Sequence, residues 1–219
     1  MFINDRTYFN HILSTEDAKS LLENLQQAIK LNNNAAKAKL YNSVVKNMKL
    51  RVVDNYLSPA KYLMKYSNAS EIAVNSGFIL MSINCILIEF YFEMINGYDV
   101  SNEAGKRVKD AYTSVLPLID KDITKKLSEI FYSGIRCGIM HQGQTKNNTA
   151  ITYEYNVVME ENGGIYLSNP ITLFNGISEL YSDYWAMISR KSCDDKAGAN
   201  LCKKFELILM HIEECLVNS

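Results

Sequence analysis

Residues 79–95 read ILMSINCILIEFYFEMI and form the most apolar run of the chain. Asn84, Glu89 and Glu93 interrupt it, and each of these side chains is costly at the centre of a bilayer. A buried polar side chain needs a hydrogen-bonding partner inside the fold. The run therefore predicts a buried core helix over about 70–96, closed by Gly97, and no membrane partner.

Amphipathic helices are expected before this core helix. Ser14 is a suitable N-cap for a helix through Leu31, with acidic side chains in its first turn. A second helix is expected over about 35–56, and Ser58-Pro59 ends it and opens a short continuation through Tyr66. Apolar residues at four-residue steps mark the buried face of the second helix: Leu40, Val44, Met48 and Val52.

Two further helices are expected after Gly97. Ser101 is a candidate N-cap for a helix that ends before Pro117. Asp120 or Asp122 is a candidate N-cap for the next helix, which carries apolar residues on one side and ends near His141.

The pattern changes after the second of these helices. Residues 151–158 are rich in β-branched and aromatic side chains and predict a strand, and residues 165–167 predict its return strand. Asn162-Gly163-Gly164 supplies the positive φ angles that a tight turn needs. The sequence therefore predicts a small β-hairpin.

These elements predict a mainly α fold in one domain. Short connections between helices are typical of a bundle. The expected parts are a single domain over 1–219, a bundle of four to five helices over about 10–145, a β-hairpin insertion over about 150–168, and C-terminal helices over about 170–217.

Composition narrows the functional classes. The 219 residues carry a formal net charge of −1 and the pI is near 6.3, which argues against a broad surface for nucleic acid but leaves room for a local basic groove. The five cysteines are irregularly spaced and suit reduced thiols better than disulfides. The N-terminal residues lack a secretory signal pattern, so a cytoplasmic location is expected.

The stretch FYSGIRCGIMHQG, residues 131–143, is the best candidate for chemistry. It contains one of three histidines, His141, five residues after Arg136. At about 100° per residue the two side chains point about 140° apart around the helix axis. They can therefore border one groove, but they do not lie on the same face of the helix. The other wall of that groove must come from another helix or from a second copy of the chain.

A helical bundle whose late helix carries Arg, four residues and then His resembles the HEPN superfamily (higher eukaryotes and prokaryotes nucleotide-binding domains). The segment IRCGIMHQGQT, residues 135–145, also resembles a phrase of bacterial HEPN-like proteins. The resemblance implies metal-independent cleavage of RNA by a homodimer, without a cofactor, in a toxin or anti-phage setting with a cognate antitoxin or defence partner. His141 would then be the acid/base, and Arg136 would bind the scissile phosphate.

Cys137 departs from the family pattern, in which a polar Asn, Asp or His often follows the arginine. It is four residues before His141 and so is its neighbour on one helical face. A thiol is a weak hydrogen-bonding group and orients an imidazole poorly. Support for the imidazole is therefore expected from other polar side chains: Gln142, Gln144, and from the core helix Glu89 and Asn84.

Other interpretations of the motif remain open. A histidine at a helix C-terminus is favoured by the macrodipole, and Arg136 can belong to an ordinary ion pair. Gly134 and Gly138 permit close helix approach, which a dimer across this helix would need. A HEPN-like module that binds a nucleotide or a protein without catalysis is the alternative function. Eight cations cluster in and around the motif in sequence and favour a local basic groove: Lys106, Arg107, Lys109, Lys121, Lys125, Lys126, Arg136 and Lys146.

A zinc site is a third possibility. Cys137 and His141 are four apart, as are His211 and Cys215, and each pair can present two ligands on one helical face. Two such helices side by side would close a tetrahedral site. Cys137 can also be considered as a nucleophile, although no third residue that orients the pair is evident from the sequence.

Overall fold

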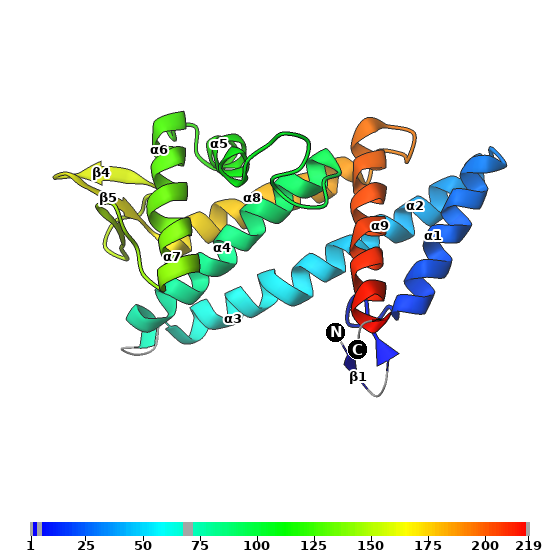
Figure 1. Cartoon of the computed structure of the whole chain (residues 1–219), viewed down its shortest axis with the longest axis horizontal. Helices are drawn as coiled ribbons and strands as arrows, with labels where there is room; N and C mark the ends of the chain where they lie inside the picture. The colour runs from blue at the N-terminus through cyan, green and yellow to red at the C-terminus, as the bar shows by residue number, and fades with distance from the viewer. Residues whose placement is uncertain (1, 4–5, 68–71, 218–219) are drawn as a thin grey trace. The chain divides into compact units, whose positions relative to one another are not determined.

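The computed structural model describes residues 2–3, 6–67 and 72–217, and its mainly α character confirms the prediction (Figure 1). The helices are α1 (Thr15–Lys30), α2 (Asn34–Val52), α3 (Ser58–Ser67), α4 (Ile72–Asn96), α5 (Val108–Ile119), α6 (Lys125–Ile130), α7 (Cys137–Gln142), α8 (Pro170–Ile188) and α9 (Lys196–Val217). Two π-helical turns, η1 (Val53–Leu57) and η2 (Phe131–Arg136), continue α2 and α6. The strands are β1 (Phe2–Ile3), β2 (Arg6–Thr7), β3 (Thr149–Ile151), β4 (Glu160–Asn162) and β5 (Ile165–Ser168).

The chain divides into two compact units. Unit 1 contains Met1–Leu57, Glu93–Val100 and Asp183–Ser219, and unit 2 contains Ser58–Phe92 and Ser101–Ser182. This division differs from the expected continuous bundle over 10–145, because C-terminal segments contribute to both units. The borders fall inside α4 and α8, so each of these helices supplies residues to both cores.

Unit 1 is built on α1, α2 and α9, which pack against one another. The predicted cap of α1 is confirmed, because the Ser14 hydroxyl accepts a hydrogen bond from the Asp17 backbone N–H at 3.0 Å. Asn33 caps α2 in the same way through the Ala36 N–H at 3.1 Å. The core is aromatic and aliphatic, with fully buried Phe9, Leu25, Tyr41, Met48 and Phe205.

The end of α4 belongs to unit 1 and contains an ion pair. The Lys204 ammonium lies 2.8 Å from the Glu93 carboxylate and also donates to the Asp99 carbonyl at 2.6 Å. Both side chains of the pair are largely buried, so each charge depends on the other. The helix closes at Gly97 with a φ of +65°, as predicted, whereas its expected start at 70–71 lies outside the described residues.

The first helices of unit 2 after α4 start later than predicted. Residues from Ser101 form turns, and α5 begins where the Asp110 carboxylate accepts the Arg107 backbone N–H at 2.7 Å. Pro117 lies inside the last turn of α5 instead of after the helix. Thr124, and neither expected aspartate, caps α6, because its hydroxyl accepts the Leu127 N–H at 3.2 Å.

The predicted hairpin is partly wrong. The turn is confirmed at Gly163 and Gly164, which have φ angles of +60° and +84°. Its strands are β4 and β5, while β5 pairs in parallel with β3 on its other side. Residues 152–159 lie outside the ladder, because the Ser168 hydroxyl and the Asn169 amide bond the carbonyls of Val158 and Tyr155, at 2.6 and 2.9 Å.

Residues 76–96 of α4 are long and apolar enough to span a membrane by length and composition. Half of the most apolar part of this helix is buried in the structure. The core helix of a soluble protein can have the same length and composition. Both glutamates of this stretch have cationic partners: Glu89 pairs with Arg136 and Glu93 with Lys204. These pairs fit the expected core helix of a soluble protein.

Gly134 and Gly138 of the 131–143 stretch allow another segment of the same chain to pack closely against the helix. A Cβ atom on Gly134 would lie 2.9 Å from the Lys146 carbonyl oxygen, and one on Gly138 would lie 3.1 Å from the Thr145 Cα. The loop that follows α7 therefore folds back against this helical face. The close approach that we considered for a dimer is made by the chain itself.

Gly138→Ala is expected to lower the free energy of unfolding by about 1 to 3 kcal/mol, because the added methyl group meets loop backbone that cannot move aside freely. Urea unfolding measures this change. Ser114→Ala, at an exposed site of α5, is the control and is expected to change it by less than about 0.5 kcal/mol. Equal values for the two variants would contradict the packing of the loop on Gly138.

His211 is expected to make stability depend on pH. Its hydrogen bond to the Asp99 carboxylate, 2.8 Å away, raises the pKa of its imidazole. A raised pKa in the folded state stabilises the protein fully below the unfolded value of about 6.5, and this contribution is lost as pH rises through the folded pKa. His211→Gln should therefore destabilise at pH 5.5 by less than about 1 kcal/mol and hardly at all at pH 9, as thermal unfolding would show.

Candidate functional site

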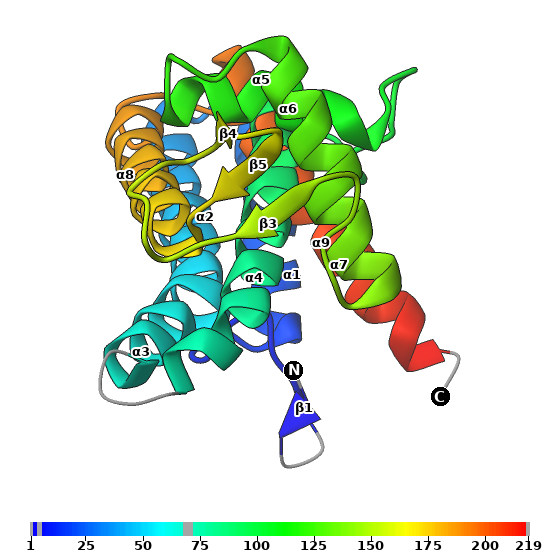
Figure 2. The same cartoon turned by 90° about the vertical axis from the view of Figure 1, so that its left-hand side faces the viewer.

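The candidate site lies in unit 2, on the helical rod made by α6, η2 and α7 (Figure 2). Arg136 is the last residue of η2, and His141 is in the last turn of α7. The rod ends at Gly143, which has a φ of +69° and donates its N–H to the Ile139 carbonyl at 3.0 Å. The end of this helix therefore matches the expected position near His141.

Arg136 is held by Glu89 of α4. Its Nε lies 2.9 Å from Glu89 Oε1 and its Nη2 lies 3.3 Å from Glu89 Oε2, a two-point contact between planar groups. The two side chains are 17% and 19% exposed. Burial lowers the pKa of Arg136, but the hydrogen bonds and the charge of Glu89 raise it by more. The guanidinium therefore stays charged.

Two tyrosines complete this cluster. The Tyr112 hydroxyl, fully buried on α5, donates to Glu89 Oε1 at 2.7 Å. The Tyr132 ring lies under Arg136, with its centroid 5.9 Å from the guanidinium carbon, which is within reach of a cation–π contact. Burial is the main reason why the pKa of Tyr112 is well above 10, so this hydroxyl keeps its proton.

His141 is exposed and stands apart from this cluster. Within the residues that the structure describes, its ring makes no hydrogen bond or ion pair. Gln142 is also exposed, and no hydrogen bond joins its side chain to the imidazole in the described part of the chain. The nearest expected supporter, Cys137, is half-buried and interacts with Tyr132: burial, followed by the interaction with Cys137, raises the pKa of Tyr132.

The two supporting residues expected from α4 have other partners than His141. Glu89 orients Arg136, as described above. Asn84 is completely buried, and its amide donates to the Pro170 carbonyl at the start of α8 at 2.9 Å. Asn84 therefore bonds backbone in the core, and its expected reach toward the imidazole is not seen. Its Oδ1 has no hydrogen-bond partner among the described residues.

The expected basic surroundings of the motif are partly neutralised. Lys109 on α5 lies 2.9 Å from the Glu129 carboxylate on α6. The hydrogen bond from Lys109, together with the charges of Lys125 and Arg107, lowers the pKa of Glu129. Three cations thus act on this one carboxylate, and the Asp110 carboxylate lies at the backbone of Arg107, so acidic groups offset part of the expected positive charge.

The alternative zinc site finds no cluster to support it in the described part of the chain. No group of three or more His, Cys, Asp and Glu side chains there is placed to hold a metal ion. His211 uses both ring nitrogens on carboxylates, with Asp99 at 2.8 Å and Glu214 at 3.3 Å. The side chain of Cys215 lies outside the described residues.

Sequence reasoning missed the tyrosines of the cluster. Tyr112 and Tyr132 were not distinguishable from core aromatic residues, which tyrosines on amphipathic helices usually are. The available signal was Glu89 itself, because a buried carboxylate needs a donor in addition to one cation.

Comparison with models of protein families, with curated proteins and with solved structures finds no match. The HEPN resemblance therefore stays a prediction that rests on Arg136, His141 and the helical architecture.

Tyr112→Phe is expected to lower the free energy of unfolding by about 1 to 3 kcal/mol, because it removes a hydrogen bond to a largely buried carboxylate. Urea unfolding measures the loss. Tyr155→Phe is the matched control at a ring that is 40% exposed, and little change is expected there. A Tyr112→Phe protein as stable as the parent would mean that the hydrogen bond from this hydroxyl to Glu89 does not stabilise the fold.

Proposed function

We propose that this chain is a HEPN-type endoribonuclease that cleaves RNA without a metal ion, acts as a homodimer and works in the cytoplasm. The observation that carries the proposal is the exposed His141 at the end of the rod in which Arg136 is fixed. An accessible imidazole and a permanently charged guanidinium are the two groups that this chemistry needs.

The arrangement suits cleavage through the ribose 2′-hydroxyl. An imidazole with a pKa near neutrality can take the proton of that hydroxyl or give one to the departing 5′-oxygen. Arg136 uses two of its five N–H groups on Glu89 and also interacts with Tyr112, and the N–H groups that remain would donate to the scissile phosphate as negative charge builds on it. Glu89 and Tyr112 would fix the direction in which those groups point.

A second copy of the chain would complete the site. Proton abstraction and proton donation need two groups, and each chain has one Arg-x4-His motif. Two motif ends facing one groove would supply two imidazoles and two guanidinium groups. Such an enzyme harms its own cell unless restrained, so a toxin or anti-phage role with a cognate antitoxin or defence partner belongs to the same proposal.

A non-catalytic HEPN-like module that binds a nucleotide or a protein is the second candidate. The Glu89 carboxylate already neutralises Arg136, and no described side chain orients His141. Both observations favour binding without turnover.

His141→Ala is expected to reduce cleavage of RNA by at least about 100-fold, because a general acid/base contributes a factor of this size. The measurement is single-turnover cleavage of a labelled RNA in the presence of EDTA. His11→Ala, at an exposed histidine of unit 1, is the matched control and should cleave at the parental rate. Circular dichroism establishes that both variants are folded.

The same assay separates the two candidates. Loss of cleavage in His141→Ala with unchanged RNA affinity supports the nuclease. RNA or nucleotide binding by the parent chain without cleavage, at protein concentrations that form dimers, contradicts the nuclease and supports the binding module.

A further inference from the structure

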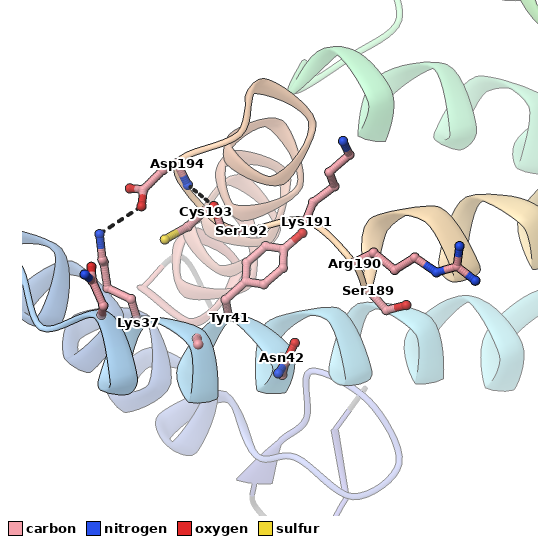
Figure 3. Close-up of a pocket in the computed structure, with 11 residues that line it drawn as sticks. Lys37, Tyr41, Asn42, Ser189, Arg190, Lys191, Ser192, Cys193 and Asp194 are labelled. Atoms are coloured by element: carbon pink, nitrogen blue, oxygen red, sulfur yellow. Dashed lines mark hydrogen bonds and ion pairs between the residues drawn. The ribbon is translucent and has the colours of Figure 1, made fainter.

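Unit 1 contains a hollow of about 360 Å³ between the first half of α2 and the loop that joins α8 to α9 (Figure 3). This volume has room for several water molecules or for a compact ligand. Tyr41 stands behind it and is fixed, because its hydroxyl donates to the Ile188 carbonyl at 3.0 Å.

The charged side chains around the hollow are predominantly cationic. Lys37 comes from α2, Arg190 and Lys191 come from the loop, and Asp194 is the one carboxylate among the lining residues. Arg190 and Lys191 are exposed, and their side chains make no hydrogen bond or ion pair with another described residue. Asp195 follows on the same loop: hydrogen bonds from Ser192, and then the charge of Lys191, lower the pKa of its carboxyl group. The cations still outnumber these two carboxylates. The hollow is therefore suited to an anion.

Lys37 is the most informative of these cations. Its side chain is 11% exposed, so its charge has lost most of its water and depends on a nearby anion. The anion present is Asp194, 2.8 Å away, whose own side chain is 61% exposed on the loop. Figure 3 shows this pair at one end of the hollow. Because Asp194 is this exposed, its carboxylate can return to water when another anion takes its place beside Lys37.

The backbone adds to the same preference. Asn34 is the first residue of α2 and lines the hollow, so the positive end of the helix dipole lies beside it. The Ala36 N–H is already bonded to the Asn33 side chain, so the helix contributes its dipole to the hollow and not that N–H group.

We propose that this hollow binds a small phosphate-bearing anion that displaces Asp194 from Lys37. A ligand with a single negative charge only replaces the carboxylate already present. A diphosphate group carries several charges in a compact volume and can contact Lys37 while it also meets the cations of the loop. This site is independent of the Arg136 and His141 motif.

Isothermal titration of the full-length chain with inorganic diphosphate at a fixed ionic strength tests the proposal. Lys37→Gln should weaken binding by about tenfold, since it removes the buried cation. Lys46→Gln is the matched control on an exposed turn of the same helix and should bind within about twofold of the parent.

Asp194→Asn gives the sharper result because it is expected to strengthen diphosphate binding, whereas Lys37→Gln is expected to weaken it. It removes the competing carboxylate from an exposed loop position, so diphosphate should bind several-fold more tightly. Asn42→Asp adds a charge at an exposed lining residue and should weaken binding. These two exposed substitutions keep the test valid if Lys37→Gln fails to fold.

Absence of saturable binding by the parent chain would overturn the proposal. So would an equal loss of affinity in Lys37→Gln and Lys46→Gln, which would indicate unspecific attraction. An Asp194→Asn chain that binds diphosphate no more tightly than the parent would also overturn it, because Asp194 would then not compete with the ligand.

Discussion

The ion pair between Glu89 and Arg136 is the constraint on which the candidate site depends. A carboxylate in the apolar α4 is tolerable only with a cation and further donors around it, and Arg136 and Tyr112 supply these at 2.7 to 3.3 Å. The pair therefore ties α4, α5 and the α6–η2–α7 rod of unit 2 to one another. Removing either charge would leave the other one largely buried without its counter-charge, which costs more than losing the pair as a whole.

Local chemistry made part of this architecture predictable. Ser14 and Gly97 were assigned correctly because a cap residue and a left-handed glycine act within one turn of the helix that they bound. Ser101 failed as a cap for a tertiary reason: it is 3% exposed, and the chain turns further before Asp110 can bond the backbone of Arg107. The first strand of the hairpin failed similarly, because side chains from Ser168 and Asn169 bond the carbonyls that a ladder would have used.

The candidate site was predictable in its residue types and not in its pairings. The positions of Arg136 and His141 on one late helix follow from periodicity alone. Glu89 was expected beside the imidazole, whereas the structure places it on the guanidinium. Sequence fixes which groups need partners, but the choice between two partners depends on how helices distant in the chain pack. The closure of Gly138 by the loop after α7 is a contact of the same kind.

The two glutamates of α4 show that a largely buried carboxylate can be paired with either of two kinds of cation. Glu89 and Glu93 are four residues apart, and each is paired with a cation within its own unit, Arg136 in unit 2 and Lys204 in unit 1. The Lys204 ammonium is a compact charge that the Glu93 carboxylate and the Asp99 carbonyl together satisfy inside the fold. A guanidinium has five N–H groups in a rigid plane, and Glu89 engages two of them. Arg136 therefore keeps more N–H groups beyond its counter-ion than a lysine in the same place would, and this difference makes it the better candidate for binding a phosphate.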